Sequence, residues 1–582
     1  MVMRKNITTL LFAMLPMMGM AQSMNVNVDS VGTLEKQLPE DKRFKVAELK
    51  ITGPLNGADL KLLSQIVTRN KVNKKIADEC LVTSLDLSEA VIMEGKAGMR
   101  TENNTMPNAL FSGAKSLVKV ILPQNIINVG RNSFDNCTAL TDVTIPESVI
   151  TIGSNAFSDC TSLSAIRLPK VLTKIEHDAF EECTSLTVVE IPENVVTIEN
   201  NAFNGCKSLS KVTILGSIKE ISSATFMGCE ALTEITVPES VTTIGNNAFR
   251  GCKSLPTIVL SEQINEIGSS AFEKCSSLSS ISIDKVEKIG SSAFEECSSL
   301  ESIDIEGVKK MGNSAFEQCT NLKSVNIQGT LDEIGMETFA NCGNLTSITL
   351  PNSIKKIESK SFIGCKSLET IELPSSLAKM NDNVFEECVS LKYIVIPTSV
   401  KDIGSSCFEN CTALDSVRIQ GFIDEIESET FRGCHSLKSV SLPVSVKKIG
   451  SKAFLECSAL TSITLPVTLQ SIGSSAFEKC SMLQSIVIPA AVKEIGSDAF
   501  RECSTLASAD LAVSLKDVSG GAFSKCVSLR EVNVNAPIPP KITKTTFKDV
   551  VLGACKFYIP KGTKSSYMQD KQWQKIPQLL ER

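Results

Sequence analysis

Hydrophobic and polar positions recur along this chain with a period of 23 residues. Phenylalanine marks the phase in 19 copies from Phe111 to Phe523, and only two of the steps are 22 residues long. A leucine follows every one of these phenylalanines six residues later, from Leu117 to Leu529. A fixed period of this length is typical of solenoids, whose coils stack and share one continuous core. The pattern therefore predicts a stack of about 19 coils over residues 105–535.

Each coil also contains a short stretch in which apolar and polar residues alternate. Val143–Ile145 and Ile463–Leu465 are two examples, and a proline such as Pro146 often follows directly. Alternation with a period of two predicts a β-strand, and proline is tolerated at its end. The rest of the coil is expected to form a helical or irregular arm. The predicted fold is an α/β repeat solenoid of the leucine-rich type, with a long parallel β-sheet on its concave side and a cap at each end.

The cysteines follow the same period as the phenylalanines. Of 21 cysteines, 18 lie three residues after a marker phenylalanine, from Cys137 to Cys526, and Cys80, Cys407 and Cys555 fall outside this phase. Side chains at one coil position point the same way, whereas a disulfide needs two converging Cβ vectors. We therefore expect free cysteines that act as small buried residues. The chain has no Cys-x-x-Cys motif and only two histidines, so no metal site is predicted.

Composition narrows the class of protein further. The 582 residues carry a net charge of −6, with 59 basic and 65 acidic side chains. Nucleic-acid binding needs a clustered basic surface, and the basic doublets here are scattered and flanked by acids. We expect no nucleic-acid partner.

Residues 1–21 have the pattern of a secretory signal peptide. Arg4 and Lys5 precede an apolar run from Ile7 to Met18, and small residues follow it at Gly19–Ala21. The run is too short and too interrupted to span a bilayer comfortably. The pattern predicts an exported chain, secreted, at the cell surface or in the periplasm, whose mature form has no membrane span.

The repeat unit itself resembles a known family. The pattern I-P-x-S-V-x-x-I-G-x-x-A-F-x-x-C-x-x-L-x-x-I, at 145–166 and with Val at its first position at 237–258, is similar to the BspA-like (Treponema pallidum type) leucine-rich repeat of Bacteroidetes. The resemblance covers about residues 105–535. It implies a secreted or surface-exposed protein, often an adhesin that binds host matrix proteins, and it defines no catalytic residues.

The flanking segments resemble the ends of the same proteins. Leu49–Gly57 and Leu85–Ser88 look like their N-terminal cap, and Tyr558–Gly562 with Trp573 looks like their C-terminal end. The expected domains after residue 21 are an N-terminal cap with irregular first repeats (22–104), the repeats (105–535) and a C-terminal cap (536–582). In the second cap, Tyr558, Trp573 and Ile576 are expected to cover the last core.

Nothing in the sequence predicts an active site or a cofactor. His177 and His435 are 258 residues apart, about eleven coils, and no nucleophile motif surrounds either of them. Paired acids follow several marker phenylalanines, and a helical arm would direct them outward as solvated charges (Glu181-Glu182, Glu295-Glu296 and Glu386-Glu387). We expect a chain that is not an enzyme.

One group of residues stands out on the predicted sheet. Its outward positions lie eight and ten residues after each phenylalanine and are mostly serine or threonine. Glu372, Val395 and Arg418 occupy one such position in three successive coils, Tyr393 is adjacent, and Phe422 follows at the far edge of the strand. Exposed tyrosine and arginine are enriched among the residues that dominate binding energy. These five residues are the predicted ligand-binding patch.

Three functions are compatible with these patterns. The first is extracellular protein binding, with adhesion to a host or matrix protein as its expected form. The second is a glycan-binding module, which predicts aromatic platforms that are absent from the sheet apart from Tyr393. The third is a passive structural protein of the envelope, which suits the uniform Ser/Thr face. A hydrolase would require a cluster of acids or a Ser/His pair, and neither is found.

Overall fold

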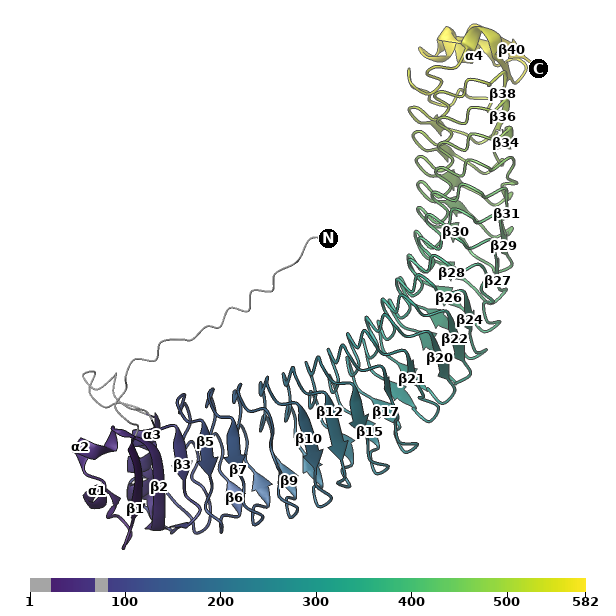
Figure 1. The fold of residues 1–582 in the computed structure, drawn as a ribbon. Helices are drawn as coiled ribbons and strands as arrows, with labels where there is room; N and C mark the ends of the chain where they lie inside the picture. Colours follow the sequence, from purple (N-terminus) through teal and green to yellow (C-terminus); the bar gives the residue numbers. More distant parts are fainter. Residues whose placement is uncertain (1–21, 69–81) are drawn as a thin grey trace, which may run out of the picture. The chain divides into compact units, whose positions relative to one another are not determined.

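The computed structural model describes residues 22–68 and 82–582. The predicted signal peptide and Cys80 lie outside these residues. The chain divides into two compact units, Met1–Leu209 and Ser210–Arg582. Both units are built from stacked coils with parallel strands (Figure 1). The predicted parallel-strand solenoid is therefore confirmed.

The first unit opens with strands and helices that precede the repeats. Its long central strand β2 pairs in parallel with β1, β3 and β4, and the buried carboxylate of Asp59 accepts the amide protons of Gly32 and Leu34. Asp59 thereby holds the loop before the first helix against α3. The elements are β1 (Gln22–Asn27), α1 (Leu34–Gln37), α2 (Glu40–Arg43), β2 (Val46–Leu55), α3 (Gly57–Thr68), β3 (Ser84–Asp86) and β4 (Ala90–Ile92).

In the repeats, most coils contain two strands, which we call the A strand and the B strand. The A strand is the predicted one and follows the repeat leucine. In the first unit the A strands are β5 (Lys119–Ile121), β7 (Asp142–Thr144) and β10 (Val188–Ile191). In the second they are β12 (Lys211–Ile214), β14 (Glu234–Thr236), β16 (Thr257–Ile258), β18 (Ser280–Ile281), β20 (Ser302–Ile305), β22 (Ser324–Ile327), β24 (Ser347–Thr349), β27 (Tyr393–Ile396), β29 (Ser416–Ile419), β31 (Ser439–Ser441), β34 (Ser485–Val487), β36 (Ser508–Leu511) and β38 (Glu531–Val534).

The B strand was not predicted. It has two residues, lies just before the Gly or Glu found at that position in most coils, and pairs in parallel with the B strands of neighbouring coils. In the first unit the B strands are β6 (Asn128–Val129), β8 (Thr151–Ile152), β9 (Lys174–Ile175) and β11 (Thr197–Ile198). In the second they are β13 (Glu220–Ile221), β15 (Thr243–Ile244), β17 (Glu266–Ile267), β19 (Lys288–Ile289), β21 (Lys310–Met311), β23 (Glu333–Ile334), β25 (Lys356–Ile357), β26 (Lys379–Met380), β28 (Asp402–Ile403), β30 (Glu425–Ile426), β32 (Lys448–Ile449), β33 (Ser471–Ile472), β35 (Glu494–Ile495) and β37 (Asp517–Val518).

The A strands of the second unit do not form one uninterrupted ladder. The coils at 369–373 and 461–465 contain no A strand, so the strand predicted at Ile463–Leu465 is wrong. The alternation still buries Ile371 and Leu465 in these coils. Burial of alternate side chains therefore continues where the strand pairing stops.

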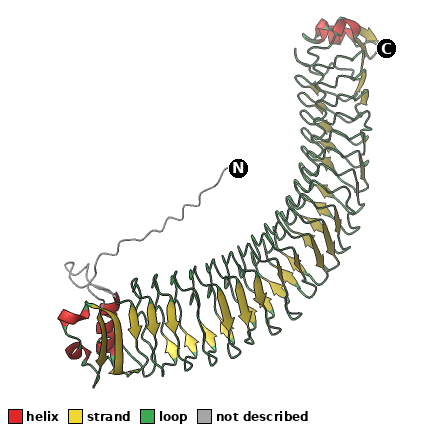
Figure 2. Cartoon of the chain, viewed as in Figure 1, coloured by secondary structure: helices red, strands yellow, loops and turns green. Residues whose placement is uncertain are grey.

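The part of each coil outside the strands, which the sequence predicted to be helical or irregular, consists of turns. The helical alternative is therefore wrong. Figure 2 shows helices only toward the ends of the chain and turns in the repeats. The reason lies in the backbone around each marker phenylalanine, where residues two before and two after it are left-handed. Ser475 and Lys479 around Phe477 have φ of 54° and 60°. A left-handed residue with a side chain is disfavoured by about 1–2 kcal/mol and interrupts a right-handed helix.

The phenylalanines form a continuous core within each unit. Their rings are fully buried, and in the second unit successive centroids from Phe226 to Phe547 lie 5.1–5.6 Å apart in stacked pairs. Each phenylalanine amide also donates to a carbonyl of the next coil, as Phe477 does to Ala499 at 2.7 Å. Stacked aromatic pairs contribute about 0.5–1.5 kcal/mol beyond burial. Ring stacking between neighbouring coils therefore favours phenylalanine at this position of every repeat.

The cysteines form a second buried ladder beside the rings. All twenty described cysteines are free, as predicted. Their thiols have a role that the sequence did not show, because most donate a hydrogen bond to the carbonyl of the phenylalanine one coil earlier. Cys342 donates to the Phe316 carbonyl at 3.2 Å, and Cys411 to that of Phe385 at 3.0 Å. The thiol thus donates a hydrogen bond to a buried carbonyl. A purely apolar residue at this position would leave that carbonyl with one hydrogen bond fewer.

We expect these thiols to be inert in the folded protein. Burial raises the pKa of Cys342 to about 12 and that of Cys555 to about 11, and the thiolate is the reactive form. Native protein near pH 8 should give colour with Ellman's reagent for at most one thiol per chain, because Cys80 lies outside the described residues, whereas protein in concentrated guanidinium chloride should react fully. Rapid modification of several thiols without unfolding would contradict this ladder.

The C-terminal cap closes the core with aromatic residues. The stacked rings end at Phe547, which meets Phe557 edge-on at 5.1 Å, and Tyr567 meets Trp573 at 5.1 Å. Trp573 and Ile576 are buried as predicted, but Tyr558 is half-exposed and Tyr567 is buried in its place. Tyr558 lies on the alternate face of its strand, whereas Tyr567 projects from a helix. The elements are η2 (Leu552–Ala554), β39 (Lys556–Ile559), α4 (Lys564–Gln569), η3 (Trp573–Lys575) and β40 (Leu579–Glu581).

Candidate ligand-binding surface

The outward side chains of the A strands in the second unit form the surface on which the predicted patch lies. On β27 the outward residues Tyr393 and Val395 alternate with the buried residues Ile394 and Ile396. Tyr393 is 53 % exposed and Val395 is 40 % exposed. Because these residues alternate with buried ones, the core holds the strand that presents them.

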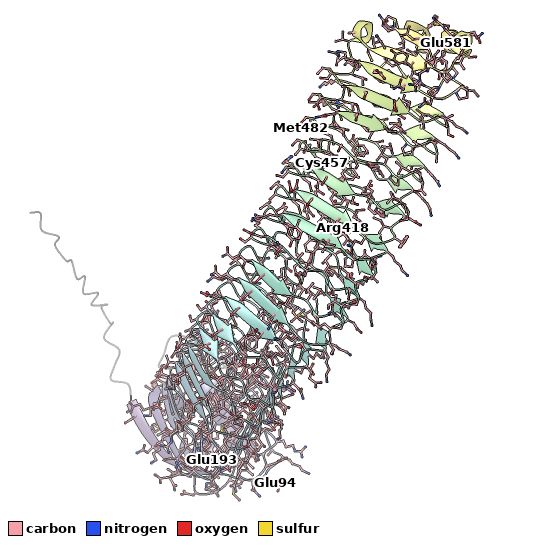
Figure 3. The ribbon with its side chains drawn as sticks, turned by 90° about the vertical axis from the view of Figure 1, so that its right-hand side faces the viewer. Glu94, Glu193, Arg418, Cys457, Met482 and Glu581 are labelled. Carbon is pink, nitrogen blue, oxygen red and sulfur yellow. The ribbon has the colours of Figure 1, made fainter. Side chains whose placement is uncertain are left out.

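Strand pairing places part of the patch in register. Val395 on β27 is the direct partner of Arg418 on β29, and Tyr393 is the partner of Ser416. Arg418 is exposed and lies on the strand face shown in Figure 3. The 23-residue spacing correctly predicted that these side chains are neighbours, since paired strands lie about 4.7–4.9 Å apart.

The other two residues of the patch lie at its borders. Glu372 is exposed but belongs to the coil without an A strand, so the expectation that it sits on a strand is wrong. Phe422 lies in the turn after β29 and is 74 % exposed, between the buried residues Gly421 and Ile423. A single phenylalanine this exposed in a turn has no packing role in the chain itself.

The charges of the patch differ from those beside it. One position before the strands, lysines and acids pair between neighbouring coils: Lys392 contacts Glu369 at 2.6 Å, and Lys438 contacts Asp415 at 2.6 Å. Arg418 and Glu372 make no side-chain hydrogen bond or ion pair within residues 22–68 and 82–582. The patch therefore offers an uncompensated guanidinium beside an aromatic ring and an aliphatic side chain.

The paired glutamates after phenylalanine are not the fully solvated charges that a helical arm would present. The first residue of each pair is half-buried, and the second lies in a left-handed turn, as Glu387 does with φ of 58°. Burial raises the pKa of Glu386, and the nearby charges of Glu409 and Glu387 raise it further, although Asn383 donates a hydrogen bond to it at 2.7 Å. These carboxylates are structural residues of the turn, each beside like charges.

Glu386→Gln should therefore stabilise the fold at neutral pH. A carboxyl group whose pKa is raised in the folded state lowers the free energy of unfolding when it is charged. This destabilisation disappears as the pH falls through the folded-state pKa toward the ordinary value of 4.5, because the group becomes protonated. We expect a gain of up to about 1 kcal/mol in the free energy of unfolding near pH 7.5 and none near pH 4. Urea unfolding of the variant and of the control Glu239→Gln, an exposed glutamate far along the same unit, at both pH values checks this. A gain that persists at pH 4 would contradict it.

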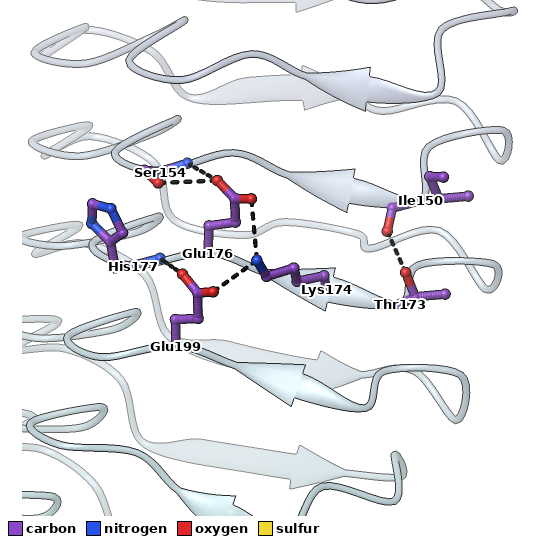
Figure 4. Close-up of polar contacts among 7 residues, drawn as sticks. All are labelled: Ile150, Ser154, Thr173, Lys174, Glu176, His177 and Glu199. Carbon is purple, nitrogen blue, oxygen red and sulfur yellow. Dashed lines mark hydrogen bonds and ion pairs between the residues drawn. The ribbon is translucent and has the colours of Figure 1, made fainter.

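In the first unit, glutamates form hydrogen bonds and ion pairs between neighbouring coils (Figure 4). Glu176 accepts hydrogen bonds from the amide and hydroxyl of Ser154 at 3.1 and 3.0 Å, and Glu199 accepts the amide of His177 at 3.1 Å. Lys174 reaches Glu199 at 2.7 Å. Burial alone would raise the pKa of Glu176, but the Ser154 hydrogen bonds and the Lys174 charge lower it overall. The backbone amide contacts explain why Glu can replace Gly at this coil position.

Each of the two histidines has a local partner. His177 contacts Asp178 at 2.9 Å, and His435 contacts the carbonyl of Glu456 at 3.0 Å; both rings lie at the surface of their own units. Within residues 22–68 and 82–582, no group of three His, Cys, Asp or Glu side chains could hold a metal ion. No helix among the same residues is long and apolar enough to cross a membrane.

Comparison with known proteins identifies the family. The model of the BspA-type leucine-rich repeat region, which spans six copies, matches residues 104–233, 219–345, 332–440 and 424–552. The chain belongs to the BspA-type leucine-rich repeat family. The matched residues cover most of the chain and contain the whole predicted patch. Members of this family are repeat proteins of the binding type, and the exposed A-strand face of this member is an extended surface suited to protein contacts.

Solved structures of bacterial leucine-rich repeat proteins are similar to this BspA-type chain. A Bacteroides ovatus protein is 23 % identical over 82 % of this chain and 91 % of its own, with a TM-score of 0.30. A leucine-rich cell surface protein of Faecalibacterium prausnitzii is 24 % identical over 62 % and 89 %, with a TM-score of 0.34. The leucine-rich repeat protein of T. pallidum is 30 % identical over 30 % and 78 %, with a TM-score of 0.27. No curated protein matches the chain.

The sequence interpretation missed a second group of exposed side chains in this BspA-type protein. Val444, Val467, Val513 and Ile538 lie in turns or bends of their coils and are 50–80 % exposed. The signal was present in the repeat pattern, because the same turn position is polar or glycine in most earlier coils. Alignment of all coils on their phenylalanines reveals the change.

Proposed function

We propose that the protein is an exported, non-enzymatic binding protein whose A-strand face contacts an extracellular protein. Its mature chain would begin at Gln22 after removal of the signal peptide and would comprise the two caps and the repeats at 105–535. Adhesion to a host or matrix protein is the expected form of this activity. Family membership and the apolar–charged pattern of residues 1–21 support the proposal.

One observation carries the position of the site: an unpaired Arg418 lies in register with Val395, beside the exposed Tyr393. Nearby lysines on the same coils are already neutralised by acids of neighbouring coils. An exposed arginine without a partner can form charge-assisted hydrogen bonds with an incoming carboxylate, and a neighbouring tyrosine adds apolar area and a hydroxyl. Glu372 and Phe422 would contact the partner at the borders.

A protein partner fits this surface better than a glycan. Sugar rings stack on flat aromatic platforms, and the strand face of the patch offers one aromatic side chain, Tyr393. The Val395 side chain and the Phe422 ring favour apolar contacts with another protein instead. A glycan-binding module remains the second candidate because Tyr393 and Arg418 together present both a ring and donors.

Biolayer interferometry of purified residues 22–582 against matrix proteins, mucins and polysaccharides tests the proposal. We expect saturable binding to a protein, with the dissociation constant raised at least about 10-fold by Tyr393→Ala/Arg418→Ala. The control Ser485→Ala/Val487→Ala changes the same coil positions on β34 and should leave binding unchanged. Binding to glycans alone would support the second candidate, and a lack of any binding would favour a passive structural role.

The export step has a separate test. N-terminal sequencing of the protein recovered from outside the cytoplasm should begin at Gln22. Recovery of an intact chain only from the cytoplasm would contradict export, whatever the binding assay shows.

A further inference from the structure

We propose that the edge of the last coils holds a second binding site, for an acidic peptide segment that carries an apolar side chain. This site is separate from the patch of Tyr393 and Arg418 and does not depend on the function proposed for it. It consists of an apolar row in turns or bends of the coils and a hollow lined by Lys493 and Lys516.

The apolar row begins abruptly along the repeat. Ten residues before the marker phenylalanine, the turn has exposed polar residues or glycine in most earlier coils, among them Glu147, Glu193, Asn352, Thr398 and Gly421. From the coil of Phe454 onward the same position is apolar in four consecutive coils: Val444, Val467, Ala490 and Val513. Ile538 continues the row in the next turn. The core does not require this change, because the side chains point into solvent.

The exposure of the row is large. Val444 is 69 % exposed, Val467 is 80 % exposed and Ile538 is 77 % exposed. Coils advance by about 4.8 Å, so the row from Val444 to Val513 extends about 14 Å along the edge. Contiguous exposed apolar side chains on a soluble protein mark a contact surface, whereas single ones do not.

A hollow lies at the C-terminal end of the row. It has a volume of about 470 Å³ and is lined by Lys493, Val513–Lys516 and Ala536–Pro539. This volume falls in the range of about 300–1,000 Å³ that is typical of ligand sites. It is large enough for one bulky aliphatic or aromatic side chain of a bound segment.

The far wall of the hollow is held rigidly. Tyr567 donates its hydroxyl proton to the Ala536 carbonyl at 2.6 Å, and Trp573 donates its indole proton to the Pro540 carbonyl at 2.7 Å. These buried cap residues pin both ends of the wall, and Pro537 and Pro539 restrict φ between them. A wall that is already ordered loses little entropy when a ligand binds.

The charge of the hollow is unbalanced. Lys493 and Lys516 are exposed, occupy one column in adjacent coils, and are the only charged residues of the lining. The Lys516 amide donates to the Lys493 carbonyl at 2.8 Å, which places the two side chains side by side. Neither ammonium group makes an ion pair in the part of the chain that the structure describes.

Three of the seven lysines at this coil position are neutralised by an acid one coil earlier. Seven residues before phenylalanine, Lys309 contacts Glu287 at 2.6 Å, Lys355 contacts Asp332 at 3.3 Å and Lys447 contacts Asp424 at 3.2 Å, in each case an acid of the preceding coil. At the hollow, the acid is replaced by a second lysine. A carboxylate supplied by a partner would complete the pairing, bridge the two ammonium groups and remove their mutual repulsion.

The occupant follows from these two properties. Its carboxylates would meet Lys493 and Lys516, and an apolar side chain between them would enter the hollow against Ile538 and Leu515. A longer segment would continue over Val467 and Val444. A basic peptide would be repelled, and an acidic peptide without an apolar residue would leave the hollow empty.

Fluorescence anisotropy with purified residues 22–582 tests the proposal. The probe is a fluorescein-labelled octapeptide, Glu-Glu-Leu-Glu-Glu-Phe-Glu-Glu, compared with versions in which Leu and Phe become Ser, or Glu becomes Lys. We expect the acidic–apolar probe to bind saturably and to weaken as salt is added. The other two peptides should bind at least about 10-fold more weakly.

Variants locate the site. Lys493→Glu/Lys516→Glu and Ile538→Ser should each raise the dissociation constant at least about 10-fold. The controls are Lys401→Glu, an exposed lysine of the same column outside the hollow, and Val259→Ser, an exposed valine directly after β16. Both should bind normally. Tyr393→Ala/Arg418→Ala should also bind normally, which separates this site from the function proposed above.

Three results would overturn the proposal. They are equal binding of the peptide that lacks Leu and Phe, equal binding by Lys493→Glu/Lys516→Glu, and no saturable binding of the probe. Circular dichroism of every variant establishes that lost binding does not reflect unfolding.

Discussion

Phe316→Ala is expected to lower the free energy of unfolding of its unit by about 3–5 kcal/mol, the range for deleting a fully buried aromatic ring. The ring is stacked between Phe294 at 5.2 Å and Phe339 at 5.6 Å, nearly parallel to both. Its removal leaves a cavity and breaks two stacking contacts in a stack where each coil depends on its neighbours. Guanidinium unfolding followed by circular dichroism measures the loss.

The matched control is another phenylalanine of the same unit, Phe422→Ala. This side chain is 74 % exposed, so its removal should change the free energy of unfolding by less than about 0.5 kcal/mol. Equal losses for the two variants would mean that the ring ladder does not hold the coils together. A broadened or two-step transition in Phe316→Ala alone would indicate that the coils on either side unfold separately.

Trp573→Ala is expected to produce a second large loss, about 3–5 kcal/mol, confined to the C-terminal coils. The indole ring is fully buried and meets Phe557 and Tyr567 edge-on, and its N–H donates to the Pro540 carbonyl. Without it, Phe557, which covers the last ring of the stack at Phe547, would lose the indole ring packed against it. Hydrogen exchange should show faster exchange of the amides of β38 and β39 than of those of β20 and β22.

Trp573→Phe separates the two contributions of this side chain. It keeps a buried aromatic ring but removes the hydrogen-bond donor and part of the ring volume, so a smaller loss of about 1–2 kcal/mol is expected. Protection of β38 that is unchanged in Trp573→Ala would show that the cap does not support the last coils. Because Trp573 is the single tryptophan of the chain, its fluorescence in the unmodified protein reports on the cap directly.

The two surfaces proposed for binding differ in how they arise. On the A-strand face, binding residues replace Ser and Thr at positions that the strand already presents to solvent. At the edge, the turn position changes from polar to apolar over consecutive coils, and a lysine replaces an acid. Both surfaces vary positions that the core does not constrain, so the solenoid can change its contacts without a change in the coil.

The predicted patch shows how far coil spacing alone could locate a site. Spacing predicted the neighbours Val395 and Arg418 correctly, because one period between parallel strands determines their register. It placed Glu372 on a strand that the structure lacks, since spacing does not determine whether a given coil forms the backbone ladder. It also gave no indication that Arg418 is unpaired, because ion pairs between coils depend on where long side chains meet.

The sequence by itself determined the period, the core and the family of this protein. Phenylalanine, cysteine and leucine recur at fixed intervals, and a solenoid brings residues one period apart into contact, so that the shared core and the free buried cysteines followed from counting. Local repetition is sufficient for this because each coil packs mainly against its neighbours.

Only the tertiary structure decided the features that depend on backbone geometry and on contacts between side chains. The left-handed residues around each phenylalanine replace a helical arm by turns, and the B strands form where neighbouring coils meet. The thiol of Cys342 donates to a carbonyl one coil away, Tyr567 and not Tyr558 closes the core, and Lys493 and Lys516 lie side by side without an acid. Each of these depends on the distance and orientation between atoms of different coils, which the order of residues along one coil does not specify.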